Sequence, residues 1–218
     1  MKLPGIFITG TDTDVGKTYI GAQLCQILYG KGIDVMPRKP VESGCDRNQD
    51  GELLPHDALA YFAACHHGIP LHDICPYRYT AAVAPDQAAR LAGGTLHLGQ
   101  LTDVCQRREE QFLLVEGAGG FYSPIAEDGL NADLAVELDL PVLLVAADRL
   151  GAINHSLLTA EAIKHRGLKL LAVILNGMET KTENEQMGNA AYLRTHLNCP
   201  VLTVSCNAQL DTAISFLY

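Results

Sequence analysis

Long apolar runs are missing from this 218-residue sequence, and none approaches the roughly 20 residues that a membrane-spanning helix needs. Basic residues are in the minority, because 16 Lys and Arg stand against 25 Asp and Glu and give a formal net charge of −9. An electrostatic field of that sign does not favour nucleic acid or anionic lipid surfaces. We therefore expect a protein that binds neither a membrane nor a nucleic acid.

Paired cysteine motifs are also missing. The seven cysteines form no C-x-x-C pair, which excludes a zinc ribbon and a thioredoxin-type motif. The chain runs from Met1 directly into Ile6-Phe7-Ile8, which predicts a first strand because a signal peptide needs a longer apolar stretch. Free thiols are typical of a reducing compartment, so we expect a cytoplasmic protein.

The pattern of apolar residues predicts an α/β fold. Apolar residues make up 48% of the chain and charged residues 19%, which excludes a disordered chain. Apolar runs of strand length alternate with amphipathic segments of helix length, which predicts an open, mostly parallel sheet with helices on both faces. The length fits one domain spanning residues 1–218. The predicted strands are 6–9, 34–39, 112–115, 141–146, 170–175 and 200–204, and the predicted helices are 17–29, 57–66, 98–110, 131–138, 153–166, 185–197 and 208–217.

The strongest motif is the segment GTDTDVGKT at residues 10–18, between the first strand and the first helix. Gly16 lets the backbone approach phosphates, Lys17 reaches the β- and γ-phosphates, and the Thr18 hydroxyl is placed for Mg²⁺. The loop departs from G-x-x-x-x-G-K-[ST], because Thr11 stands where the first glycine is expected. A helix that begins at such a loop offers free N–H groups to an anion. The motif predicts the P-loop NTPase fold and a bound nucleoside triphosphate.

Polar residues at the ends of predicted strands indicate the rest of a site. Glu116 ends an apolar strand and precedes a glycine run, so it is a candidate Mg²⁺ ligand. Lys39 lies at the carboxyl end of the second strand, where ligands bind in such sheets. Asp57 begins a helix, so taken alone it is expected to be an N-cap, a position compatible with metal binding. Asn176 is either a turn residue or an amide that pairs with adenine.

Four segments together resemble the dethiobiotin synthetase family. The resemblance implies an ATP- and Mg²⁺-dependent ligase that carboxylates 7,8-diaminononanoate with CO₂ and closes the ring. Dethiobiotin, ADP and phosphate would form through a carbamate and a carbamic-phosphoric anhydride. A homodimer is implied as well. The segments are GTDTDVGKT at 10–18, KPVESG at 39–44, VEGAGG at 115–120 and LGAINH at 150–155.

The resemblance also implies residue roles. Lys17 and Lys39 would hold carbamate and γ-phosphoryl oxygens, and Thr13 and Ser43 would orient the carbamate and the diamine. Asp12 and Asp14, which would repel phosphate, would instead attract the cationic diamine. The implied metal ligands are Thr18, Asp57 and Glu116, and the implied nucleotide-binding residues are Asp14, Val15, Gly16, Lys17, Thr18, Tyr19, Asp57, Glu116, Gly119 and Asn176. The substrate carboxylate would bind a second subunit at Gly151, Ala152, Ile153 and Asn154.

Two alternatives stand beside this interpretation. An amidoligase of the cobyric acid type would carry a fused glutaminase domain, for which the chain has no room. A partition-type nucleotide switch usually has a second lysine early in the loop, where this chain has Asp12 and Asp14. The stretch 203–207 lacks the Gly-x-Ile-Pro segment that the family commonly uses near adenine, which leaves the nucleotide preference open.

Overall fold

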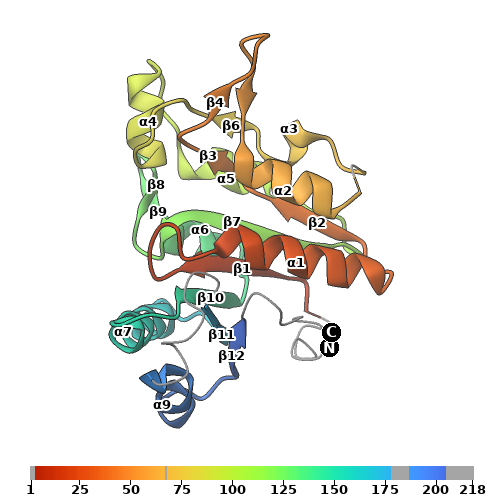
Figure 1. The fold of residues 1–218 in the computed structure, drawn as a ribbon. Coiled ribbons are helices and arrows are strands. Elements are labelled where there is room, and N and C mark those ends of the chain that lie inside the picture. Colours follow the sequence, from red (N-terminus) through yellow and green to blue (C-terminus); the bar gives the residue numbers. More distant parts are fainter. Residues whose placement is uncertain (1–2, 67, 178–186, 205–218) are drawn as a thin grey trace.

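The computed structural model describes residues 3–66, 68–177 and 187–204. Its centre is a six-stranded sheet in the order β12-β11-β10-β1-β7-β2 (Figure 1), and all five neighbouring pairs are parallel. The predicted parallel sheet is therefore confirmed. The strands are β1 (Gly5–Gly10), β2 (Val35–Arg38), β7 (Phe112–Gly120), β10 (Val142–Ala147), β11 (Leu170–Asn176) and β12 (Val201–Val204).

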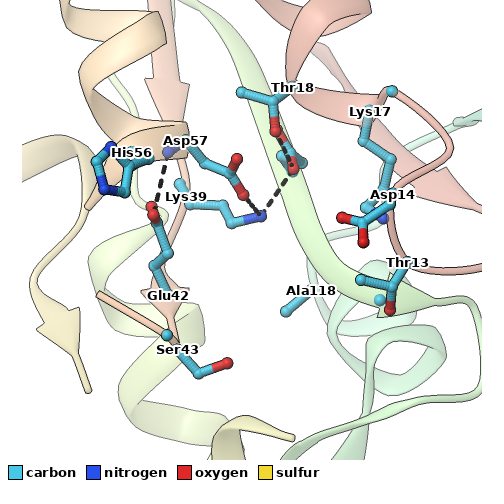
Figure 2. Close-up of a pocket in the computed structure, with 14 residues that line it drawn as sticks. Thr13, Asp14, Lys17, Thr18, Lys39, Glu42, Ser43, His56, Asp57 and Ala118 are labelled. Carbon is cyan, nitrogen blue, oxygen red and sulfur yellow. Dashed lines mark hydrogen bonds and ion pairs between the residues drawn. The ribbon is translucent and has the colours of Figure 1, made fainter. Parts of the chain in front are cut away.

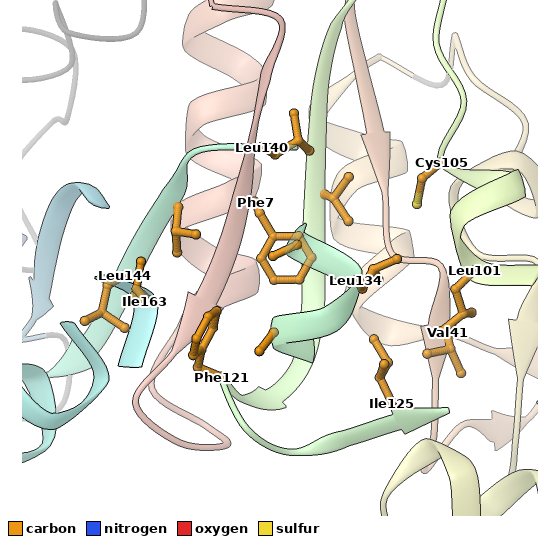
Figure 3. Packing of buried hydrophobic residues seen from close by; sticks show 14 of the residues in the cluster. Phe7, Val41, Leu101, Cys105, Phe121, Ile125, Leu134, Leu140, Leu144 and Ile163 are labelled. Atoms are coloured by element: carbon orange, nitrogen blue, oxygen red, sulfur yellow. The ribbon is translucent and has the colours of Figure 1, made fainter. Parts of the chain in front are cut away.

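Helices cover both faces of this sheet, as predicted. Alternation along β1 divides the core, because Ile6 and Ile8 face one apolar cluster while Phe7 faces the other. The helices α1 (Lys17–Gly30), α2 (His56–Ala64) and α3 (Leu71–Ile74) contribute to the first cluster. Figure 3 shows part of the second cluster. The helices that contribute side chains to it are α4 (Pro85–Leu91), α5 (Leu98–Val104), α6 (Asn131–Glu137), α7 (Ala152–His165) and α9 (Asn189–His196).

The strand order positions the functional site. The chain passes from β1 through α1 to β2, returns to β7 between them, and then continues to β10 on the other side of β1. The direction of winding therefore reverses at β1. In open parallel sheets a crevice forms at such a reversal, outside the carboxyl ends of the strands. The loop that follows Gly10 lies at this end of the sheet.

Three small strand pairs lie outside the main sheet. The polar, turn-rich segment 40–56 contains β3 (Val41–Glu42), β4 (Asp46–Arg47) and β5 (Leu53–Leu54). β4 and β5 pair with each other, and β3 pairs in parallel with β6 (Tyr77–Arg78). β8 (Pro124–Ala126) and β9 (Gly129–Leu130) form the third pair. Two-residue strands carry too little apolar periodicity for the sequence to reveal them.

Two predicted element lengths are wrong. The helix predicted over 98–110 ends at Val104, because the polar run 106–110 has no apolar side chain to bury and forms a turn instead. In that turn Arg107 donates to the carbonyl oxygens of Glu109 and Gln111. The strand predicted over 112–115 continues to Gly120. The predicted helix 208–217 lies outside the described residues, as do positions 185–186 of the helix predicted over 185–197.

Within the described part of the chain, no helix is both long and apolar enough to cross a membrane.

Candidate functional site

The loop between β1 and α1 forms a tightly held turn. Gly16 lies at the N-cap of α1 with a φ of 93°, in the left-handed region that favours glycine. A Cβ atom there would lie 2.0 Å from Nδ2 of Asn176, so no other residue fits. The Lys17 ammonium is buried and donates to the carbonyl oxygen of Asp12 at 3.0 Å. Burial lowers the pKa of Lys17, while the neighbouring Glu116 carboxylate opposes that change.

The Lys39 ammonium is the centre of the site (Figure 2). Its Nζ lies 2.6 Å from Oδ2 of Asp57 and 2.7 Å from Oε1 of Glu116, and it also donates to the Gly117 carbonyl at 3.2 Å. Burial alone would lower the pKa of Lys39, but these two carboxylates raise it well above its usual value. Burial would raise the pKa of Asp57, and Lys39 reverses this, so the pKa of Asp57 is lowered. Lys39 and Asp57 are therefore both charged at neutral pH.

Glu116 uses its two oxygens differently. Oε1 accepts hydrogen bonds from the Thr18 hydroxyl at 3.0 Å and from Lys39 at 2.7 Å. Oε2 accepts from the Tyr61 hydroxyl at 2.7 Å. The prediction that Glu116 ends its strand is wrong, because β7 continues for four more residues and Glu116 pairs with Ile8 inside the sheet. This position explains why its side chain is 1% exposed and rigidly held.

The oxygen atoms around Lys39 fit Mg²⁺. The carboxylates of Asp57 and Glu116 both contact one buried cation, the Lys39 ammonium, and the Thr18 hydroxyl donates to the same Glu116 oxygen, so the cluster already suits positive charge. Mg²⁺ prefers oxygen ligands and is usually bound by one or two carboxylates together with phosphates and water. No group of three or more His, Cys, Asp or Glu side chains that could hold a metal occurs among the described residues. A hydroxyl with two carboxylates is a donor set of the kind that suits Mg²⁺.

A pocket of about 490 Å³ opens beside this cluster. The structure brings together most of the predicted site residues on its wall, and Figure 2 shows them arriving from the β1–α1 loop, the segment after β2, the start of α2 and the end of β7. The lining residues are Thr13, Asp14, Gly16, Lys17, Thr18, Lys39, Glu42, Ser43, Gly44, His56, Asp57, Glu116, Ala118 and Gly119.

Other predicted site residues do not line this pocket. Val15 is buried in the core, Tyr19 lies on α1 with 37% exposure, and Asp12 accepts the backbone N–H of Thr13 at 2.8 Å. Asn176 donates through Nδ2 to the Val15 carbonyl at 3.0 Å, so it ties the loop to the end of β11. Its Oδ1 is buried and has no hydrogen-bond partner among the described residues. That oxygen is an acceptor available to an amino group.

The predicted carboxylate site also lies away from the pocket of its own chain. Gly151 has a φ of 94° and caps the start of α7, and Ala152 is buried. Asn154 is exposed, and the preceding Leu150 is 92% exposed. None of these residues is among those that line the pocket.

Glu42 is a functional residue that sequence reasoning did not find. Its Oε1 accepts the backbone N–H of Asp57 at 3.0 Å, and its Oε2 accepts that of Ala58 at 3.1 Å. The prediction that Asp57 is an N-cap is wrong, because Pro55 holds that position and Glu42 supplies the acceptors. The Asp57 side chain is thereby free to face Lys39. The KPVESG segment contains Glu42, but nothing in its spacing reveals a partner 15 residues later.

Tyr61 was missed as well. It is fully buried on α2 and donates to Glu116. Burial raises the pKa of Tyr61 well above its usual value, and Glu116 raises it further, so the hydroxyl remains a donor at neutral pH.

Replacing Glu42 with alanine should destabilise the protein by about 1–2 kcal/mol, because the start of α2 loses both side-chain acceptors. Urea unfolding would measure the free energy of unfolding of Glu42→Ala beside that of Glu52→Ala. Glu52 is exposed, so its removal should change stability by less than about 0.5 kcal/mol. Equal, small effects of both substitutions would contradict the capping role.

Comparison with known proteins shows which proteins this chain is similar to. A family model described as an AAA domain matches residues 4–211. The ATP-dependent dethiobiotin synthetase BioD of Anaeromyxobacter sp. (strain Fw109-5) is 45% identical over 174 residues, covering 79% of this chain and 76% of the relative. The enzyme of the same name from Ruthia magnifica is 36% identical over 199 residues, covering 91% of this chain and 90% of the relative.

Solved structures confirm the P-loop NTPase fold. A putative plasmid partition protein from Borrelia burgdorferi, bound to AMPPNP, superposes with a TM-score of 0.52 at 11% identity, covering 97% of this chain and 90% of that one. At such low identity the likeness extends to the fold alone. The sequence relatives carry the assignment, which confirms the resemblance of the four segments: this chain belongs to the ATP-dependent dethiobiotin synthetase family.

Proposed function

We propose that this chain uses ATP and Mg²⁺ to carboxylate 7,8-diaminononanoate with CO₂ and to close the product into dethiobiotin, releasing ADP and phosphate. Membership of its family makes the chain an ATP-dependent ligase that forms dethiobiotin. The observation that carries the rest of the proposal is the buried cluster of Lys39, Thr18, Asp57 and Glu116 beside the phosphate-type loop. Residues 1–218 would act as one domain.

The nucleotide would bind along the loop and the start of α1. Backbone N–H groups near Gly16 and the Lys17 ammonium supply positive potential for the phosphates. The unpartnered Oδ1 of Asn176 supports a contact with the adenine amino group. Asp14, Val15, Tyr19 and Gly119 complete the proposed nucleotide site.

Thr18, Asp57 and Glu116 would hold Mg²⁺ through their oxygens. When bound, the ion would neutralise the charge of the β- and γ-phosphate oxygens. Lys39 lines the pocket, so its ammonium would interact both with these carboxylates and with the reacting oxygens.

The proposed reaction moves negative charge at each step. One amine adds CO₂ to give a carbamate anion, a carbamate oxygen attacks the γ-phosphoryl group, and ADP leaves. The second amine then attacks the carbonyl carbon of the carbamic-phosphoric anhydride and expels phosphate. Lys17 and Lys39 would stabilise the charge on the carbamate and phosphoryl oxygens. Thr13 and Ser43, which line opposite sides of the pocket in Figure 2, would orient the carbamate and the diamine.

A homodimer would complete the site. In one subunit Gly151, Ala152, Ile153 and Asn154 lie outside the pocket of their own chain, and α7 starts there. A helix start suits a carboxylate because its N–H groups are free. We propose that these residues of a second subunit bind the substrate carboxylate, and that Asp12 and Asp14 attract the cationic amines.

Phosphate release from ATP tests the function directly. The assay contains Mg²⁺, with bicarbonate and 7,8-diaminononanoate added separately and together. Release should require both additions, with dethiobiotin detected by mass spectrometry in equal amount. Release that is indifferent to both would contradict the substrate assignment and favour a partition-type switch. Release that requires a different carboxylate and glutamine or ammonia would favour an amidoligase of the cobyric acid type.

Lys39→Gln should lower kcat by about 100-fold or more, because a buried cation that faces developing negative charge is lost. The KM for ATP should change much less. Steady-state kinetics would measure both, with thermal unfolding to verify that the variant is folded. Lys164→Gln, at an exposed lysine, is the control. A weaker affinity for ATP with an unchanged kcat would make Lys39 a nucleotide-binding residue instead.

Asn154→Ala should raise the KM for the diamine about 10-fold and leave the KM for ATP nearly unchanged, because the loss is confined to the carboxylate site. Glu161→Ala, an exposed position on the same helix, is the matched control and should change neither constant. Equal increases in both KM values for Asn154→Ala would count against a carboxylate site at the start of α7.

A further inference from the structure

We propose that Tyr61 is a positioning residue for the metal and phosphate site: its buried hydroxyl holds Oε2 of Glu116, so that Oε1 alone faces Thr18 and Lys39. The inference deepens the proposed function and rests on its assignment of Glu116 as a metal ligand. Tyr61 is not among the residues that line the pocket, so it would not touch substrate or metal.

The contacts of Glu116 divide between its two oxygens. The Tyr61 hydroxyl donates to Oε2 at 2.7 Å, while Thr18 and Lys39 donate to Oε1 at 3.0 and 2.7 Å. Glu116 and Tyr61 are both buried, at 1% and 0% exposure, so water does not compete for Oε2. A hydrogen bond to a carboxylate in such surroundings is strong and directional. Rotation of the carboxylate would break all three bonds, and its orientation is therefore determined.

Gly21 makes this arrangement possible. It lies inside α1, where glycine is about 1 kcal/mol less favourable than alanine. Its backbone requires no left-handed conformation, so conformational freedom does not explain the glycine. A Cβ atom at this position would lie 1.9 Å from the Tyr61 hydroxyl oxygen and 2.7 Å from Cζ. The missing side chain provides the space through which the phenol reaches Glu116.

The Tyr61 contact also joins the elements that carry the site. α1 begins with Lys17 and Thr18, α2 carries Asp57 four residues before Tyr61, and β7 carries Glu116. Residues four apart lie on the same side of a helix, so from one side of α2 Asp57 reaches Lys39 and Tyr61 reaches Glu116. The hydroxyl therefore ties α2, which carries Asp57, to the strand that carries Glu116.

The test is Tyr61→Phe, which removes the hydroxyl and keeps the ring. Calorimetry would measure binding of a non-hydrolysable ATP analogue at several Mg²⁺ concentrations and without Mg²⁺. The apparent Kd for Mg²⁺ should rise about 10-fold or more, as is typical when a partner of a metal ligand is lost. The Kd of the analogue without Mg²⁺ should not change. If Tyr61 had only a structural role, Tyr61→Phe would lower the free energy of unfolding and leave the effect of Mg²⁺ on analogue binding unchanged.

Two further variants sharpen the test. Ser156→Ala removes another fully buried hydroxyl, on α7, and should leave the Mg²⁺ dependence unchanged. Gly21→Ala should displace the phenol and raise the Kd for Mg²⁺ although the hydroxyl remains. If binding of the analogue to the wild type depends on Mg²⁺ and Tyr61→Phe shows the same dependence, the proposed role of Tyr61 is wrong and the metal assignment stands. If wild-type binding is indifferent to Mg²⁺, the metal assignment of the proposed function fails and this inference fails with it.

Discussion

The buried ammonium of Lys39 is the interaction on which the rest of the site depends. A lysine at 3% exposure stays charged only because two carboxylates lie within 2.7 Å of it. Removing one partner of a buried ion pair leaves a charge without compensation, at a cost of about 3–5 kcal/mol. Lys39 follows β2, Glu116 lies in β7 and Asp57 lies in α2, so one cation requires three distant segments to meet. The same oxygens that satisfy this cation are those suited to Mg²⁺.

Helix α2 has a larger part in the site than its position at the side of the pocket indicates. Glu42 caps its first turn, Asp57 faces Lys39, and Tyr61 reaches Glu116 from one turn further along. Two carboxylates can bind one small ion at short distances only if their orientations are fixed. The contacts of Glu42 and Tyr61 fix the orientation of α2, which carries one of these carboxylates. Gly21 on α1 is part of the same constraint, because any side chain there would collide with the phenol.

The chain is acidic as a whole, yet the fold places two lysines at the wall of the pocket. The whole chain has a formal net charge of −9, yet Lys17 and Lys39 both line the pocket at the start of α1. A phosphate responds to the local potential, to which the two lysines and the start of α1 contribute positive charge at short range. Lys39 is paired with Asp57 and Glu116, which offsets part of the negative charge of the pocket wall. Asp14, at the pocket wall, is an acid in position to meet a cationic amine.

The sequence by itself determined the parallel sheet, the phosphate-type loop and the family, because these depend on local patterns: apolar runs, the GKT segment and four short motifs. It also named Lys39 from its place at the end of a parallel strand, Glu116 from the apolar run and glycine run around it, and Asp57 from the start of a helix and the family resemblance. Only the tertiary structure decided how they meet: the place of Glu116 inside β7, the capping of α2 by Glu42 and the contact of Tyr61 with Glu116 through the space above Gly21. The two side-chain hydrogen bonds join residues 15 and 55 positions apart, and Glu116 pairs with Ile8 from a still more distant part of the chain. No local pattern records these contacts, because they form only when the whole sheet and its helices have assembled.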